Sequence, residues 1–268
     1  MNNWYRPFFG YARPHERRRQ RVRRVRADRH RHAMTATPNV PKYYRVRTEL
    51  ESILTELEVG DAVPAERELA LRFTVSRETV RQAIHELLVE GRVERRGRGT
   101  VVASPKLVQP LSLRSYTEGA VSQGRVPGRE LVTFEELGAD ADLAEALGLA
   151  FGAPVIHLER VLLADDEKIG LESTHLPADR FGEMARTFDP GTSLYAAIRE
   201  TGVVFASATE RIETVLASPR EAALLDSTTA MPMLRLHRVS LDTDGVPIER
   251  VRSLYRGDRI AFLTTLRE

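Results

Sequence analysis

The sequence contains no cysteine among its 268 residues. Disulfide bonds and catalysis by a thiolate are therefore excluded, while a reducing compartment is compatible with the chain. The sequence also lacks any run of about 18 apolar residues, the length with which a helix spans a bilayer, so no membrane span is expected. The motifs G-x-S-x-G, H-E-x-x-H and C-x-x-C are absent too. Their absence removes common signatures of hydrolases, metalloproteases and redox enzymes.

What the sequence does contain is an uneven distribution of charge. The formal net charge is +2, but residues 1–40 hold 11 arginines against Glu16 and Asp28, a balance of +9, and the remaining chain balances at −7. Aromatic residues precede this arginine run, which reverses the order of a secretory signal, so secretion is not expected. Two interpretations of residues 1–40 remain open. One is a basic arm that contacts DNA; the other, which we favour, is a disordered or untranslated segment before a start at Met34.

The stretch Val75–Thr100 organises the rest of the chain. Its first half has the apolar spacing of one helix face, carried by Val80, Ala83, Ile84, Leu87 and Leu88. Ser76 is a suitable N-cap for this helix and Gly91 a suitable stop. Two short strands are expected next, joined by the basic turn at residues 96–99.

Two further amphipathic helices are expected upstream, at residues 46–57 and 64–73. The whole pattern is therefore helix, helix, turn, helix and hairpin, with arginines at the start of the third helix and on the hairpin tip. A helix that fits the major groove, beside a basic hairpin that can lie on phosphates, is typical of nucleic-acid binding. The alternative is a solvated amphipathic helix followed by an ordinary hairpin.

This region resembles the winged helix-turn-helix domain of GntR-family transcriptional regulators. The matching motifs are Pro64–Ala70, Val75–Ala83, Glu90–Gly91 and Gly97–Thr100. The resemblance implies a DNA-binding domain at 41–104, with contacts from Arg67, Ser76, Arg77, Glu78, Thr79, Arg81, Arg96 and Gly97. Glu78 departs from the family pattern: it either accepts from a cytosine amino group or faces solvent.

Residues 105–110, with a proline at each end, are expected to be a linker, and residues 111–268 a second domain. Strands are predicted at 130–137, 154–164, 168–176, 203–216, 231–242, 246–256 and 260–266, and helices at 140–147, 179–186, 192–200 and 219–225. Asp165-Asp166 and the stretch Asp242–Gly245 each separate two strands, which predicts hairpin turns. Long strands joined by hairpins predict an α+β fold with a mostly antiparallel sheet.

The second half also resembles a known domain, the UTRA effector domain of HutC-type GntR regulators. Within them it is similar to the DasR and NagR group of amino-sugar-responsive repressors. The resemblance implies the fold of chorismate lyase without its chemistry. It rests on Leu113–Glu118, Leu158–Arg160, Leu171–His175, Thr192–Tyr195, Pro219–Ala222 and Glu249–Arg259.

The resemblance further implies a site for a phosphorylated amino sugar, with glucosamine 6-phosphate or N-acetylglucosamine 6-phosphate as first candidates. The expected site residues are Ser115, Tyr116, Thr117, Arg160, Glu172, Ser193, Tyr195, Glu249 and Tyr255. Two departures bear on the ligand: Leu162 stands where those repressors have a second arginine, and Arg114 where they have threonine. Losing one phosphate arginine removes about 1.5–3 kcal/mol, so a less charged metabolite is an alternative.

Together these features predict a cytoplasmic, homodimeric repressor that binds double-stranded DNA at a pseudo-palindromic operator, with half-sites about one turn apart. No cofactor, metal site or membrane association is expected, and the chain is not expected to be an enzyme. Two alternatives remain: a lyase-like enzyme, which ligand turnover would reveal, and a nucleoid-type DNA binder with a degenerate effector domain.

Overall fold

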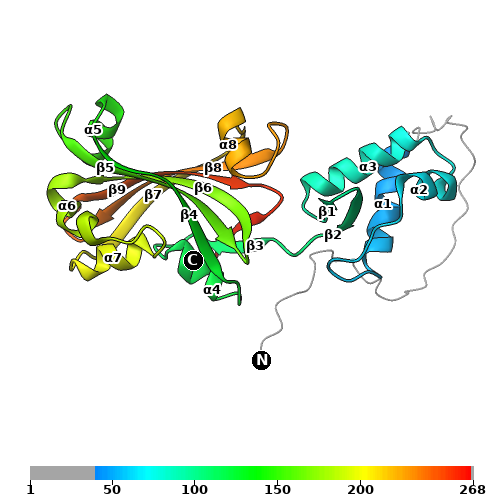
Figure 1. Cartoon of the computed structure of the whole chain (residues 1–268), viewed down its shortest axis with the longest axis horizontal. Coiled ribbons are helices and arrows are strands. Elements are labelled where there is room, and N and C mark those ends of the chain that lie inside the picture. The colour runs from blue at the N-terminus through cyan, green and yellow to red at the C-terminus, as the bar shows by residue number, and fades with distance from the viewer. Residues whose placement is uncertain (1–39, 267–268) are drawn as a thin grey trace, which may run out of the picture. The chain divides into compact units, whose positions relative to one another are not determined.

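The computed structural model describes residues 40–266 of the chain (Figure 1). The predictions about the arginine-rich segment, including the start at Met34, lie outside these residues. The first part described, which we call the head, has the expected order of elements. These are α1 (Lys42–Leu54), α2 (Glu66–Phe73), α3 (Arg77–Val89), β1 (Val93–Arg96) and β2 (Gly99–Val102).

The three helices of the head pack around one apolar core because each presents the face that its spacing predicts. Leu50, Leu69 and Val80, one from each helix, are fully buried, and each such side chain contributes about 1.5–3 kcal/mol of hydrophobic free energy. The predicted N-cap of α3 is confirmed, since Ser76 Oγ accepts a hydrogen bond from the Thr79 backbone N–H at 3.1 Å. The packing and the cap together fix the orientation of α3.

The hairpin of the head pairs Val93 with Val102 and Arg96 with Gly99. The turn between its strands needs a left-handed residue, which Gly97 supplies with φ of +58°. An additional bridge joins Ala62 to Val101, so the hairpin is tied to the chain between α1 and α2. The head is therefore a winged helix-turn-helix, as the sequence predicts.

The second domain is built on a six-stranded antiparallel sheet with strand order β4-β5-β6-β9-β8-β7. Helices α5 and α8 lie on one face of this sheet, and α4 and α7 on the other (Figure 1). The six strands of this sheet are β4 (Pro127–Gly138), β5 (Pro154–Ala164), β6 (Glu167–Pro177), β7 (Phe205–Leu216), β8 (Pro232–Asp242) and β9 (Pro247–Arg256). The domain has two further strands, β3 (Leu107–Pro110) and β10 (Ile260–Leu263), which pair with each other. The helices of the second domain are α4 (Tyr116–Val121), α5 (Ala141–Leu147), α6 (Ala178–Thr187), α7 (Leu194–Glu200) and α8 (Pro219–Leu224).

Both predicted hairpin turns are present, for different physical reasons. Asp165 and Asp166 adopt φ of 50° and 65°, the left-handed conformation that aspartate tolerates. In the other turn, Asp242 Oδ1 accepts hydrogen bonds from the backbone N–H groups of Asp244 and Val246 at 3.0 and 2.8 Å. The mostly antiparallel α+β fold is thereby confirmed.

The segment between head and sheet differs from the prediction of a plain linker at 105–110. Residues Leu107–Pro110 form β3, which pairs in parallel with β10 near the C-terminus. Sequence reasoning missed this pairing because a four-residue strand gives almost no periodic signal. The short helix α4, which Tyr116 and Thr117 open, is likewise not among the predicted helices. No helix within residues 40–266 is long and apolar enough to cross a membrane.

Candidate DNA interface and effector pocket

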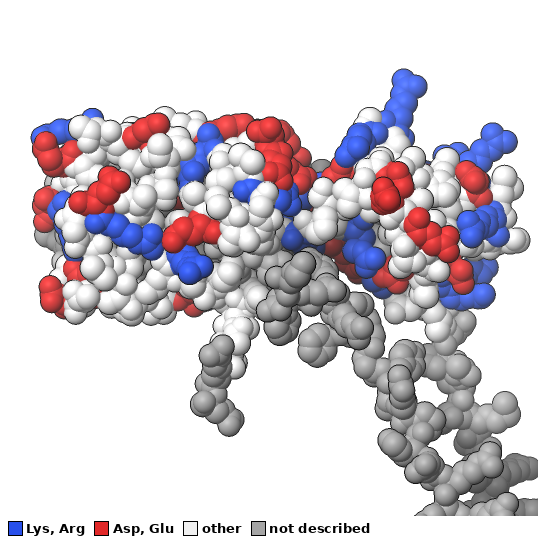
Figure 2. Space-filling view, turned by 90° about the horizontal axis from the view of Figure 1, so that it is seen from below, with Lys and Arg blue, Asp and Glu red and all other residues white. Residues whose placement is uncertain are grey.

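The surface of the head carries the arginines that the sequence assigns to DNA. Lys and Arg side chains project from this part of the molecule (Figure 2). Arg67 on α2, Arg77 and Arg81 on α3 and Arg96 on the wing are all exposed. Gly97 stands at the wing tip with no heavy atom within 4 Å of the position a Cβ would take. A strand of DNA can therefore approach the wing tip closely.

One glutamate organises the arginines around α3. The carboxylate of Glu66, at the start of α2, lies 3.4 Å from Arg81, 3.4 Å from Arg95 and 4.0 Å from Arg77. Ion pairs of exposed groups are worth at most about 1 kcal/mol, so a DNA phosphate can replace Glu66 readily. The sequence does not indicate this role of Glu66, because its approach to the wing depends on the tertiary fold.

Glu78 and Thr79 lie at the exposed beginning of α3 and take part in local contacts. Glu78 accepts a hydrogen bond from Arg81 at 2.8 Å, and Thr79 Oγ1 lies 2.9 Å from Ser76 Oγ. The glutamate therefore fixes the orientation of the Arg81 side chain on the exposed face of α3. A base donor such as a cytosine amino group can compete for the same carboxylate.

The effector domain contains a pocket on the face of the sheet that α4 and α7 cover. Seven of the predicted effector residues line this pocket: Ser115, Tyr116, Arg160, Glu172, Ser193, Tyr195 and Tyr255. The remaining two, Thr117 and Glu249, lie behind the pocket wall and touch lining residues instead. Further lining residues that sequence reasoning did not name are Gln109, Arg129, Arg238, Ser253 and Phe262.

Arg160 is the most deeply placed cation of the pocket, and only 3% of its side chain is exposed. It donates to the backbone carbonyls of Thr192 and Pro190 at 2.9 and 3.2 Å, and to Glu172 at 3.0 Å. Its Nε is buried with no hydrogen-bond partner among the described residues. A guanidinium held this firmly at the pocket wall is preorganised to interact with an anion.

Arg129 is a second cation of the pocket. In the sheet it stands directly opposite Leu162, the position where the resemblance leads one to expect an arginine. It donates to Thr117 Oγ1, and its Nε also lacks a partner among residues 40–266. Burial, and then repulsion from Arg160, lowers the pKa of the Arg129 guanidinium. Arg129 therefore places a cation of the neighbouring strand beside Leu162 in the pocket.

The pocket hydroxyls differ in how free they are. Ser115 caps α4: its Oγ donates to Glu118 at 2.9 Å and accepts from the Glu118 N–H at 3.2 Å. Ser193 caps α7 by accepting a hydrogen bond from the Ala196 backbone N–H. Tyr116 donates to the Leu163 carbonyl, and burial raises the pKa of its phenol. These groups shape the pocket first, and can offer a ligand only their remaining hydrogen-bonding capacity.

A polar network lies beneath the pocket floor. Glu249 is fully buried and accepts hydrogen bonds from Tyr195 and from Ser240, the latter at 2.8 Å. Burial raises the pKa of Glu249 to about 7. Arg238 donates to Tyr195 at 2.9 Å and to the Ser112 carbonyl at 3.2 Å. Glu249 therefore positions the Tyr195 hydroxyl, and Tyr195 in turn lines the pocket.

Two family models match the sequence of this chain. Residues 42–102 match the bacterial regulatory proteins of the gntR family, and residues 122–261 match the UTRA domain. The chain belongs to the GntR family. The two matches coincide with the winged head and with the sheet that carries the pocket, so sequence and structure agree on both parts.

Curated relatives and a solved structure agree with this membership. The transcriptional repressor PhnF of Mycolicibacterium smegmatis is 52% identical over 86% of this chain and 95% of the relative. The repressor NagR of Bacillus subtilis is 34% identical over 84% of this chain and 94% of that protein. A crystal structure of PhnF from Mycobacterium smegmatis matches with a TM-score of 0.62 and 53% identity, covering 83% of this chain and 99% of that one. The chain is therefore a DNA-binding transcriptional repressor of the GntR family, and these relatives are regulators rather than enzymes.

Proposed function

We propose that this GntR-family repressor is a cytoplasmic homodimer whose affinity for a pseudo-palindromic operator is set by a small phosphorylated metabolite. The observation that carries the ligand class is the pair Arg129 and Arg160. Both guanidinium groups line one pocket, and Glu172 is the carboxylate paired with Arg160. Two buried cations repel each other, and a phosphate monoester compensates them with charge-assisted hydrogen bonds of about 1.5–3 kcal/mol each.

The remainder of the pocket fits the polar part of a sugar. Glu172 accepts from a hydroxyl or an amine, while Ser253 and Tyr195 offer hydroxyl groups on the same wall. Glucosamine 6-phosphate and N-acetylglucosamine 6-phosphate are therefore the first candidates. Arg129 weakens the case for a less charged metabolite, because it supplies the second cation that Leu162 lacks.

A thermal-shift titration tests the effector. The two amino-sugar phosphates are expected to raise the melting temperature at millimolar concentration, because a ligand of the folded state stabilises it by mass action. Unphosphorylated N-acetylglucosamine should have little effect, and Arg129→Gln and Arg160→Gln should each remove the shift. Arg211→Gln, which deletes an exposed arginine of β7, is the matched control. If neither sugar phosphate shifts the wild-type protein, the ligand belongs to another class.

A gel-shift experiment tests the DNA interface. Arg77→Ala and Arg81→Ala should abolish specific operator binding and leave the fold intact, since their side chains are 64% and 50% exposed. Arg186→Ala removes an arginine that is 76% exposed on α6 of the other domain, and should bind operator normally. Normal binding by both α3 variants would show that α3 is not the recognition helix.

A further inference from the structure

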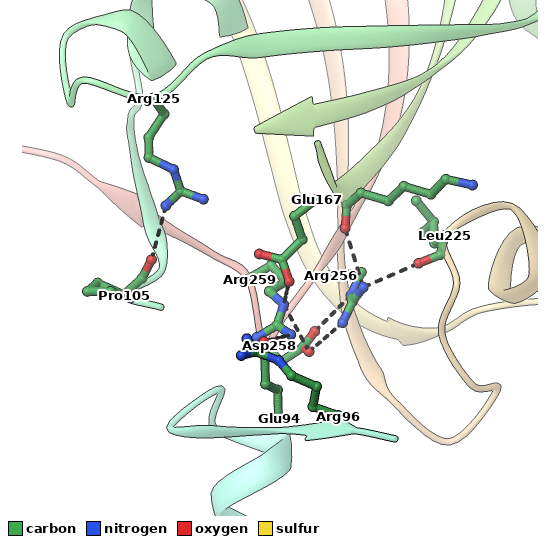
Figure 3. Close-up of polar contacts among 10 residues, drawn as sticks. Glu94, Arg96, Pro105, Arg125, Glu167, Leu225, Arg256, Asp258 and Arg259 are labelled. Carbon is green, nitrogen blue, oxygen red and sulfur yellow. Dashed lines mark hydrogen bonds and ion pairs between the residues drawn. The ribbon is translucent and has the colours of Figure 1, made fainter. Parts of the chain in front are cut away.

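The wing contains a glutamate that is shared between two arginines from different parts of the fold. Glu94 of β1 accepts from Arg96 of the wing tip at 2.8 Å through one carboxylate oxygen. Its other oxygen accepts from Arg259 of the effector domain, also at 2.8 Å (Figure 3). Only 9% of the Arg259 side chain is exposed, so this ion pair is shielded far better than the arginine contacts of Glu66.

The segment that carries Arg259 is itself fixed by a dense set of polar contacts. We call residues 256–259 the latch loop. Arg256 donates hydrogen bonds from Nε and Nη2 to the Asp258 carboxylate at 3.2 and 2.8 Å, and another to the Leu225 carbonyl at 3.3 Å. Arg259 also forms an ion pair with Glu167 of β6 (Figure 3). The loop is therefore a firm support for the wing.

Two further contacts of the latch loop accompany the ion pair. Gly91, which ends α3 with φ of +69°, lies so close to the latch loop that a Cβ would stand 2.0 Å from the Asp258 carbonyl oxygen. Lys106 Nζ, between head and sheet, donates to the Gly257 carbonyl at 2.6 Å. Glycine at position 91 thus satisfies the turn and the close approach at the same time.

The latch loop connects directly to the effector pocket along the chain. Tyr255 precedes it and Phe262 follows it, and both residues line the pocket. Their rings pack edge to face with centroids 5.4 Å apart. Strand β10, which carries Phe262, pairs with β3, whose Gln109 and Pro110 line the pocket as well. A ligand that repositions these walls must also act on the loop between them.

We propose that the latch loop docks the wing onto the effector domain and couples the pocket to DNA binding. The docked state keeps Arg259 on Glu94, so Glu94 does not fully neutralise Arg96, and the wing tip retains net positive charge for a phosphate. When the loop moves, Glu94 pairs with Arg96 alone and the head is released. Occupancy of the pocket then changes operator affinity by favouring one of two latch states. The coupling to a ligand rests on the proposed function, whereas the docking itself does not.

Spin labels test the docking in the full chain, since a protein without cysteine can be labelled at introduced sites alone. His85→Cys on α3 and Glu145→Cys on α5 are exposed positions outside both candidate sites. With the labelled chain diluted into an excess of unlabelled protein, so that a dimer carries one labelled protomer, double electron–electron resonance should give one narrow distance distribution. Adding Arg259→Gln or Glu94→Gln should broaden it, and adding Arg211→Gln should not. A broad distribution in the parent protein, or an unchanged one in both latch variants, would overturn the docking.

Fluorescence anisotropy with labelled operator tests the coupling. Saturating glucosamine 6-phosphate is the probe, and Arg259→Gln should reduce the probe-induced change in operator Kd by at least about fivefold, the lower end of typical allosteric effects. An unaltered response in Arg259→Gln would show that the latch does not carry the signal. If the probe does not bind, the proposed effector fails, while the spin-label distances still decide whether the wing is docked.

Discussion

Replacing Glu249 by glutamine should change how the stability of the effector domain depends on pH. The carboxyl is enclosed by Tyr195 of α7 and by Ser240 and Arg238 of β8, with Glu172 nearby on β6. Burial raises its pKa from the ordinary 4.5 to about 7. The folded state therefore binds this proton more tightly than the unfolded state. The resulting stability is complete below pH 4.5 and is lost as the pH rises towards 7.

The size of the effect follows from these two pKa values. Each unit of difference corresponds to about 1.4 kcal/mol, so the interval from 4.5 to about 7 amounts to about 3 kcal/mol. His175, on the other face of the sheet, contributes a pH dependence of stability with the opposite sign. Burial, then the charges of His157 and Arg250, lowers the pKa of His175 from 6.5 to about 4. The contribution of His175 to the free energy of unfolding is complete above pH 6.5. It falls by about 3 kcal/mol as the pH drops towards 4, because the unfolded state then binds this proton more tightly than the folded state.

The two contributions nearly cancel in the wild-type protein between pH 4.5 and 6.5, and single variants separate them. Glu249→Gln should gain stability as the pH rises through this range, whereas His175→Gln should lose it. At about 2–4 °C of melting temperature per kcal/mol, each variant should diverge from wild type by about 6 °C or more in a scanning-fluorimetry series from pH 4 to 8. Parallel pH profiles of Glu249→Gln and wild type would refute this account of the buried carboxyl.

Three other perturbations have definite expected outcomes. Ser76→Ala removes the cap of α3 and should cost about 1 kcal/mol by chemical denaturation; an unchanged midpoint would contradict the cap. Gly170→Ala places a Cβ 2.6 Å from the Tyr255 ring, and should cost about 1–3 kcal/mol and weaken the sugar-phosphate thermal shift; Gly182→Ala on α6, with no atom within 4 Å, is its control. A chain of residues 34–268 should keep the salt dependence of operator binding, whereas a slope reduced by about 0.9 per lost phosphate contact would show that the basic arm binds DNA.

The parts of the fold that sequence reasoning predicted are those specified by local signals. Helix α3 has both a strong period and a cap, and the turn at Asp242 has its own side-chain acceptor. Strand β3 was missed because it exists only by pairing with β10, far along the chain. Short strands of this kind are determined by tertiary contacts rather than by propensity.

The pocket shows the same division between local and tertiary information. Arg160 and Glu172 were named because they stand in a recognisable motif, and they do lie side by side. Arg129 lies on a strand whose boundaries were predicted too short, so its register against Leu162 was out of reach. Glu249 is predicted to contact the ligand, but it lies behind Tyr195, which lines the pocket in its place. The alternation of β9 alone does not reveal this arrangement.

Arg129 and Leu162 stand opposite each other on neighbouring strands, and this pairing bears on how the positive charge of the pocket is supplied. Leu162 is fully buried among the apolar residues packed around Tyr116 and Tyr255, and an arginine there would add another buried cation beside Arg129 and Arg160, in a pocket that Arg114 and Arg238 also line. Two buried guanidinium groups already carry a desolvation penalty that only an anion offsets. The proposed phosphate site therefore draws its two cations from the neighbouring strands β4 and β5 rather than from β5 alone. Cross-strand register, rather than sequence position, decides which residue fills that role.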